Sequence, residues 1–115
     1  MHITALILGA ATAAGAAGQF LDAYTTNYGV NVAKVAVEGN SAAKGLVARP
    51  TLNYIVKAGG PLLGGLLGLF LIPYLVGYPE AGDAQVFFSI TLVAAALVGF
   101  FAAKSNAKIN GGWHL

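Results

Sequence analysis

Three long runs of apolar residues dominate this chain and constrain its fold more than any other feature. They cover residues 3–26, 52–77 and 84–103. A helix needs about 20 residues, at a rise of about 1.5 Å per residue, to cross a hydrocarbon core of about 30 Å. Inside lipid each backbone N–H and C=O must be bonded within its own segment, so the runs should be helices. We therefore predict an all-α integral membrane protein with three transmembrane helices, forming a single membrane domain over residues 1–115.

The scarcity of charge agrees with this prediction and argues against several classes of function. Of the 115 residues, 57% are hydrophobic and 9% are charged, whereas soluble domains carry about 25% charged residues. The six Lys and Arg residues are not clustered as nucleic-acid binding requires. The chain has no Cys, and His2 and His114 stand at opposite ends, so we expect no metal site, no cofactor and no nucleic-acid partner. No motif brings a nucleophile or paired carboxylates together, and we expect no catalytic residues and no enzymatic activity.

The segment 27–50, between the first two spans, is more polar than the spans. Within residues 30–38 apolar side chains recur on one helical face, and Lys34 and Glu38 are four residues apart. This spacing favours an ion pair on a helix surface. We predict a short helix at the membrane interface, with Lys34 and Glu38 as an interfacial ion pair, ending near Gly39. The alternative, in which the first span continues past the interface, stays open.

The distribution of basic residues indicates the orientation in the membrane. The segment 27–50 carries three basic residues and the tail 104–115 carries two, whereas the turn 78–83 carries only acidic ones. Three spans place the first segment and the tail on the same side, which the positive-inside rule makes cytoplasmic. We predict an outer N-terminus and a cytoplasmic tail, in a prokaryotic inner membrane or a virus-related membrane.

Small residues recur at helical spacing in the first two spans. The second span carries a stripe with one glycine every four residues, Gly60, Gly64 and Gly68, and the first span carries Ala11, Gly15 and Gly18. Small residues at this spacing let two helix backbones approach closely. We predict that these six residues are helix-packing positions. Whether the two stripes face each other or another copy of the chain stays open.

Asp22 and Lys57 are the ionisable residues within the predicted spans. Each lies four to five residues from the same membrane boundary, which is a depth of about 6–7.5 Å. We predict that they form an intramembrane ion pair, and the register that pairs them also places Gly15 beside Gly64. A proton or ion relay would need further polar residues across the membrane. Because the third span offers only two, we favour a structural role for the pair.

Several of these residues form a pattern of acidic, hydroxyl, amide and basic side chains: Asp22, Thr25, Thr26, Glu38-Gly39-Asn40 and Lys57. In this pattern the first half of the chain resembles a family of short, multi-span prokaryotic membrane proteins of unknown function. The motif of that family is an Asp with following threonines, a Glu-x-Asn-Pro, and a basic residue in the next span. Ser41 stands where the proline of the motif would be. The resemblance implies a membrane location and no particular activity.

These patterns together favour a small, non-enzymatic membrane protein that is a structural or accessory subunit of a larger membrane assembly. We expect it to pack through its Gly-rich helix faces, with the lipid bilayer and other membrane protein subunits or copies of itself as partners. The alternative is a pore-forming oligomer, because three spans with an outer N-terminus and a lysine-bearing cytoplasmic tail resemble phage holins in topology. An ion-coupled transporter is disfavoured, since few polar residues could line a path.

Overall fold

The computed structural model describes residues 2–36 and 41–115, with the side chains of all of these except 41 and 42. Within these ranges all regular structure is helical, in the order α1 (Ile3–Asn27), the π-helical turn η1 (Tyr28–Val32), α2 (Ser41–Val47), α3 (Pro50–Leu66), the π-helical turn η2 (Leu67–Leu71), α4 (Ile72–Val76) and α5 (Glu80–Ile109). Three continuous helical stretches are long and apolar enough to cross a membrane: Ile3–Val32, Pro50–Val76 and Glu80–Ile109. The predicted all-α membrane fold with three spans is confirmed.

The first span is longer than the apolar run that predicted it. The π-helical turn η1 extends the helix to Val32. Lys34 then takes the left-handed backbone conformation, with φ of 56°, which commonly ends helices. The Val35 N–H closes this end by bonding to the Gly29 carbonyl at 2.9 Å. The span therefore continues past the expected boundary, as the alternative for this segment proposed.

The short helix between the first two spans lies further along the chain than expected. Residues 30–32 belong to η1 and continue the first span, and residues 33–36 are not helical. The described part of residues 30–38 therefore does not form the separate interfacial helix that was predicted. Glu38, the acidic member of the predicted interfacial ion pair, lies outside the described residues. The short helix is instead α2, which is attached to the end of the first span because the Asn31 side chain donates to the Val47 carbonyl at 2.8 Å.

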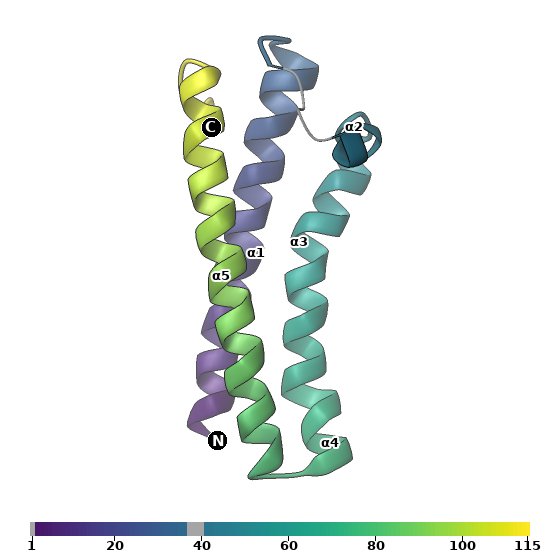
Figure 1. The fold of residues 1–115 in the computed structure, drawn as a ribbon, viewed down its shortest axis with the longest axis vertical. Coiled ribbons are helices and arrows are strands. Elements are labelled where there is room, and N and C mark those ends of the chain that lie inside the picture. The colour runs from purple at the N-terminus through teal and green to yellow at the C-terminus, as the bar shows by residue number, and fades with distance from the viewer. Residues whose placement is uncertain (1, 37–40) are drawn as a thin grey trace.

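The three spans form an elongated antiparallel bundle of 50 × 23 × 20 Å (Figure 1). The first span packs along α5 and against α3, whereas α3 and α5 make few direct contacts. Figure 1 shows the N-terminus beside the α4–α5 turn at one end, and α2 and the C-terminus at the other. At the centre of the bundle an apolar core is formed by Leu8, Ala11 and Leu92, with Leu69 and Phe88 packed against it.

The small-residue stripe of the first span lies mainly against α5 rather than against the second span. A Cβ atom added at Gly18 would stand only 2.6 Å from the Ala96 carbonyl oxygen, and one added at Gly99 would overlap the Gly18 backbone. One added at Gly15 would lie 3.1 Å from the Leu92 carbonyl oxygen. The two backbones can approach this closely because neither helix presents a large side chain at these positions.

The second span contacts α1 through a glycine ridge that shares only Gly68 with the predicted one. A Cβ added at Gly65 would overlap the Thr12 side chain, and Gly68 lies against Leu8 and Phe88. A Cβ at Gly60 or at Gly64 would meet nothing within 4 Å, so these two predicted packing residues do not contact the rest of the described chain closely. The ridge that faces α1 contains Gly65, and Gly64 is turned away from it by about 100°.

The register of the second span also differs from the expected one. Gly15 lies against Pro61, three residues before the predicted partner Gly64, a displacement of about 4.5 Å along the helix. Side chains tilt toward the N-terminus of their helix, and a lysine is long. The backbone of Lys57 can therefore lie nearer to the α4–α5 turn than Asp22 does, and the lysine side chain still reaches the carboxylate. The ion pair is thus compatible with the observed register.

Candidate functional site

The carboxylate of Asp22 and the ammonium of Lys57 form an ion pair, with Lys57 Nζ 2.6 Å from Asp22 Oδ2. The two side chains are 13% and 26% exposed, respectively, and both belong to membrane-spanning stretches. Charges in such a position are costly unless they are paired or can reach water. The contact joins the first and second spans.

The third span completes the coordination of the same carboxylate. Asn106 Nδ2 donates to Asp22 Oδ1 at 3.2 Å, and it also lies 3.1 Å and 2.9 Å from the hydroxyl oxygens of Thr25 and Thr26. Thr26 donates to Asp22 Oδ1 at 3.3 Å. One turn further, Asn110 Nδ2 donates to the Thr25 carbonyl at 2.9 Å. Asp22 is therefore the point at which all three spans meet.

Sequence analysis did not identify Asn106 and Asn110 as members of this cluster. Two asparagines four residues apart lie on one face of a helix, and they follow the third apolar run directly enough to share the depth of Asp22. The spacing of four residues between Asn106 and Asn110 was the sequence feature that could have indicated this polar face. Thr25 and Thr26 entered only through a family resemblance, without a stated contact.

Asn53 is a further buried polar residue beside this cluster. It lies four residues before Lys57, on the same face of α3, and it is 1% exposed. Its Oδ1 atom has no hydrogen-bond partner among the described residues.

A second polar cluster lies toward the opposite end of the bundle, around Gln85. This side chain is fully buried, accepts a hydrogen bond from Thr4 Oγ1 at 2.7 Å, and lies 2.8 Å from the hydroxyl of Tyr78. Its Nε2 also donates to the Gly68 carbonyl at 3.1 Å. Gln85 thus joins α5 to both other spans, and sequence analysis did not identify it.

The backbone of η2 explains why the Gly68 carbonyl accepts a side-chain bond. In the π-helical turn the Ile72 N–H bonds to the Leu67 carbonyl. The next residue, Pro73, has no N–H to offer. The Gly68 carbonyl therefore lacks its usual donor, and in a membrane span it must find another one. Gln85 supplies that donor.

The two polar clusters are separated by the apolar core of Leu8, Ala11 and Leu92. In the same layer the Thr12 hydroxyl is satisfied within its own helix, where it donates to the Leu8 carbonyl at 2.7 Å. Gln19 and Ser89, which also lie between the clusters, likewise donate to backbone carbonyls, those of Ala95 and Gln85, each at 2.7 Å.

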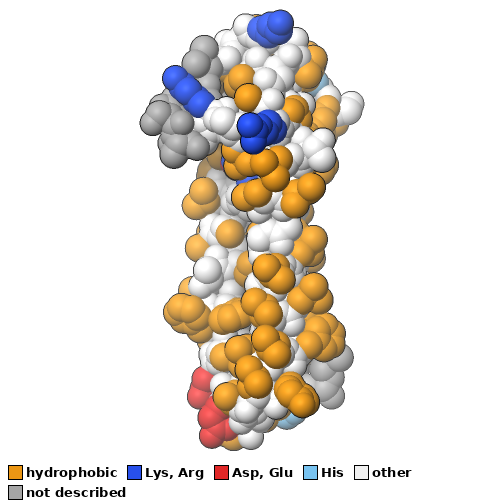
Figure 2. All heavy atoms as spheres, turned by 90° about the vertical axis from the view of Figure 1, so that its right-hand side faces the viewer, with side chains coloured by type: hydrophobic (Ala, Val, Ile, Leu, Met, Phe, Trp, Pro, Cys, Tyr) orange, Lys and Arg blue, Asp and Glu red, His pale blue; other side chains and the backbone are white. Residues whose placement is uncertain are grey.

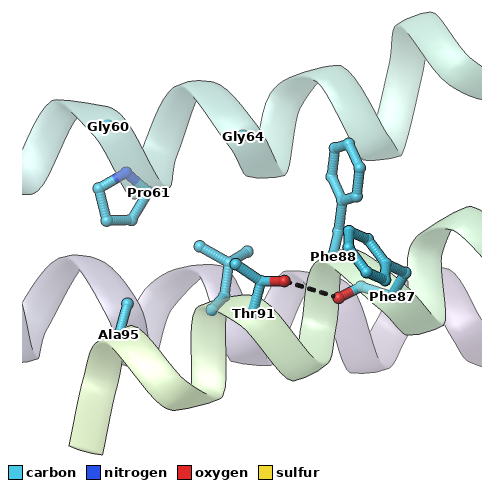
Figure 3. A pocket seen from close by; sticks show the side chains of 8 residues that line it. Gly60, Pro61, Gly64, Phe87, Phe88, Thr91 and Ala95 are labelled. Atoms are coloured by element: carbon cyan, nitrogen blue, oxygen red, sulfur yellow. Dashed lines mark hydrogen bonds between the residues drawn. The ribbon is translucent and has the colours of Figure 1, made fainter. Parts of the chain in front are cut away.

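An apolar groove of about 340 Å³ lies between α3 and α5. Its lining consists of Gly60, Pro61, Gly64, Phe87, Phe88, Thr91, Leu92 and Ala95. Figure 3 shows α3 and α5 separated at this level, with Pro61 and Phe88 reaching into the space between them. The Thr91 hydroxyl donates to the Phe87 carbonyl of its own helix at 3.1 Å, so the polar atom in the lining is already bonded.

The outer surface is divided into three zones along the long axis. Figure 2 shows Lys and Arg side chains at one end, Asp and Glu at the other, and hydrophobic side chains over the middle. The acidic end contains Glu80 and Asp83. Large apolar residues such as Phe70 and Phe101 are 68% and 69% exposed, as the lipid-facing surface of a membrane protein requires.

The chain was compared with known proteins at three levels. No family model matches it, and neither a curated protein nor a solved structure matches it.

Proposed function

We propose that this protein is a non-enzymatic subunit of a larger membrane assembly, and that it packs against another transmembrane helix through the groove between α3 and α5. The observation that supports this proposal is the open surface of Gly60 and Gly64, which line the groove but have no neighbour within 4 Å of an added Cβ. The groove offers a partner helix a close approach to the α3 backbone.

Three glycines that are packed inside the bundle provide a contrast with Gly60 and Gly64. Gly18, Gly65 and Gly68 lie where a methyl group would meet a neighbouring helix, so internal packing accounts for them. Glycine at an exposed helix position weakens the helix and leaves its surface uncovered. At Gly60 and Gly64 the missing side chains instead widen a groove whose opposite wall, on α5, combines the small residues Thr91 and Ala95 with the large apolar residues Phe87, Phe88 and Leu92.

The groove also defines the kind of partner. Its lining is apolar, and its one hydroxyl is bonded within α5. In lipid, helices associate through van der Waals contact and small residues rather than through the hydrophobic effect. The partner proposed is therefore a transmembrane helix with a ridge of apolar side chains, from another subunit or from a second copy of this chain.

We place the basic end of the bundle in the cytoplasm as part of the same proposal. The described residues Lys34, Lys44, Arg49, Lys104 and Lys108 all lie at that end, with α2 and the C-terminus. The positive-inside rule assigns such an end to the cytoplasmic side. The membrane proposed is the prokaryotic inner membrane or a virus-related membrane.

Replacement of a groove glycine tests the proposal. Gly64→Leu fills the groove, and nothing within 4 Å of the new Cβ opposes it in the isolated chain. Gly59→Leu is the matched control, because an added Cβ there also meets nothing within 4 Å but Gly59 does not line the groove. After gentle detergent extraction from native membranes, the wild type and Gly59→Leu should co-purify with a partner subunit or a differently tagged copy.

The Gly64→Leu variant should purify without a partner, and its helix content should equal that of the wild type. Equal retention of partners by both variants would contradict the proposal. A pore-forming oligomer would give a different result: expression of the wild type would make the membrane permeable to small ions, which a packing subunit does not do.

A further inference from the structure

We propose that the C-terminal end of α5 carries a binding site for the phosphate headgroup of an anionic phospholipid. A groove of about 350 Å³ lies there, lined by Lys104, Ala107, Lys108, Gly111, Gly112 and Trp113. Two lysines, which carry ammonium groups, and a tryptophan, which carries an indole N–H, thus line a space that is open at the surface. These donors suit the oxygen atoms of a phosphate diester.

The charges in this groove have no local counter-ion among the described residues. Lys104 and Lys108 are exposed and stand four residues apart, on one face of α5. The ion pair found in the described chain joins Asp22 to Lys57, and the acidic residues Glu80 and Asp83 begin α5 at its far end. An anion from outside the chain is therefore the partner that complements the two lysines.

The groove is built by a tail that turns back on the bundle. Gly111 and Gly112 have φ of 79° and 147°, values that glycine adopts readily. The Gly112 N–H bonds to the Ala107 carbonyl at 2.8 Å, which ends the helix. The change of chain direction at Gly111 and Gly112 brings Trp113 next to the face of α5 that carries Lys104 and Lys108.

Contacts with the first span hold the tail in this position. The His114 ring stacks on Tyr28 with a centroid distance of 4.1 Å, and its Nε2 lies 2.8 Å from the Asn110 carbonyl oxygen. The Tyr24 hydroxyl donates to the His114 carbonyl. These contacts hold the backbone next to Trp113, and Trp113 lines the groove together with Lys104 and Lys108.

The surface next to the groove favours a phospholipid over a soluble phosphate ester. Leu97 and Phe101 precede Lys104 by seven and three residues, which places all three on the same face of α5. Leu97 is 53% exposed and Phe101 is 69% exposed. An acyl chain can lie along these two side chains while the phosphate rests on the lysines. Tryptophan is also common at the level of lipid headgroups, where Trp113 would stand.

The chain contains a single tryptophan, Trp113, so its fluorescence reports directly on this groove. The full chain is reconstituted into phosphatidylcholine vesicles that contain a minor fraction of phosphatidylglycerol with matched acyl chains. Bromine atoms, which quench tryptophan, are placed on the acyl chains of one lipid or of the other. We expect brominated phosphatidylglycerol to quench Trp113 more strongly than brominated phosphatidylcholine at equal mole fraction.

Two double variants of equal net charge separate a local site from general surface charge. Lys104→Gln/Lys108→Gln should lower the preference for phosphatidylglycerol by roughly thirty-fold, the effect of two lysines at an anionic surface. Lys34→Gln/Lys44→Gln should leave the preference within roughly three-fold of the wild type. Circular dichroism checks that both variants keep their helices.

Three results would overturn the proposal. Equal quenching by the two brominated lipids in the wild type would show that the groove does not select an anionic headgroup. An equal loss of preference in both double variants would show attraction to the membrane surface alone. Release of brominated phosphatidylglycerol by glycerol phosphate in solution would assign the groove to a soluble phosphate ester. This inference does not depend on the assembly proposed above, since that proposal concerns the α3–α5 groove.

Discussion

A methyl group at Gly65 should destabilise the bundle, whereas the same change at the adjacent Gly64 should not. An added Cβ at Gly65 would overlap Thr12, with the two Cβ atoms only 2.8 Å apart. Thr12 cannot simply rotate away, because its hydroxyl donates to the Leu8 carbonyl at 2.7 Å. Either that bond breaks or α1 and α3 move apart.

The expected change in the free energy of unfolding is the net result of two opposing effects. Overpacking of a close contact costs about 1–3 kcal/mol, and replacement of glycine by alanine in a helix returns at most about 1 kcal/mol. Gly65→Ala should therefore lower the free energy of unfolding by up to about 2 kcal/mol. Gly64→Ala meets nothing within 4 Å and should leave the free energy of unfolding unchanged or raise it by less than about 1 kcal/mol.

Titration with sodium dodecyl sulfate in mixed micelles, followed by circular dichroism, measures both values. The background variant Thr12→Ala provides a further check, because it removes two of the three Thr12 atoms that crowd the new methyl group. In that background Gly65→Ala should cost less than in the wild type. Equal stability of Gly64→Ala and Gly65→Ala would show that α1 does not contact α3 along the ridge described.

Three further predictions concern the polar contacts and the topology. Asp22→Asn and Lys57→Met should each lower the free energy of unfolding by about 1 kcal/mol, because each leaves an unpaired charge in the membrane. The double variant leaves no unpaired charge and should lose less stability than either single variant; additive losses in the same titration would contradict the pairing. Gln85→Leu should cost about 2 kcal/mol, since three hydrogen bonds of about 0.6 kcal/mol each are lost in the membrane; a change within experimental error would contradict its role in joining the spans. Single cysteines at the exposed positions Asp83 and Ser105 should react with an impermeant thiol reagent from opposite sides, Asp83 in intact cells and Ser105 only after permeabilisation. Labelling of both from outside would refute the proposed topology.

The three spans could be predicted from the sequence because hydropathy and length alone determine them. The neighbourhood of Asp22 and Lys57 could also be anticipated, since two ionisable residues at similar depth have few other partners in a membrane. Their register could not be read from helix geometry, because a long lysine side chain tolerates a shift of about 4.5 Å between backbones. The glycines of α3 and η2 that contact α1 are accordingly Gly65 and Gly68, and not Gly60 and Gly64.

The remaining contacts depend on the third span, for which the sequence analysis assigned no packing face. The small residues Ala96 and Gly99 follow Leu92 at helical spacing and carried the signal that α5 packs closely on the first span. Gln85 is a single polar residue at the start of an apolar run, and its role depends on the carbonyl that η2 leaves without a backbone donor. Nothing in the apolar pattern distinguishes a π-helical turn from an α-helix.

Photo-crosslinking from the groove tests the proposed assembly most directly. A diazirine-bearing amino acid is placed at Thr91, which lines the groove, or at Leu63, which is 60% exposed but lies outside it. After illumination of native membranes, the probe at Thr91 should give one discrete band at the mass of this chain plus a partner protein. The probe at Leu63 should give adducts with lipid only. Lipid adducts alone at both positions, or the same protein band from both, would contradict the claim that the groove between α3 and α5 is the packing surface.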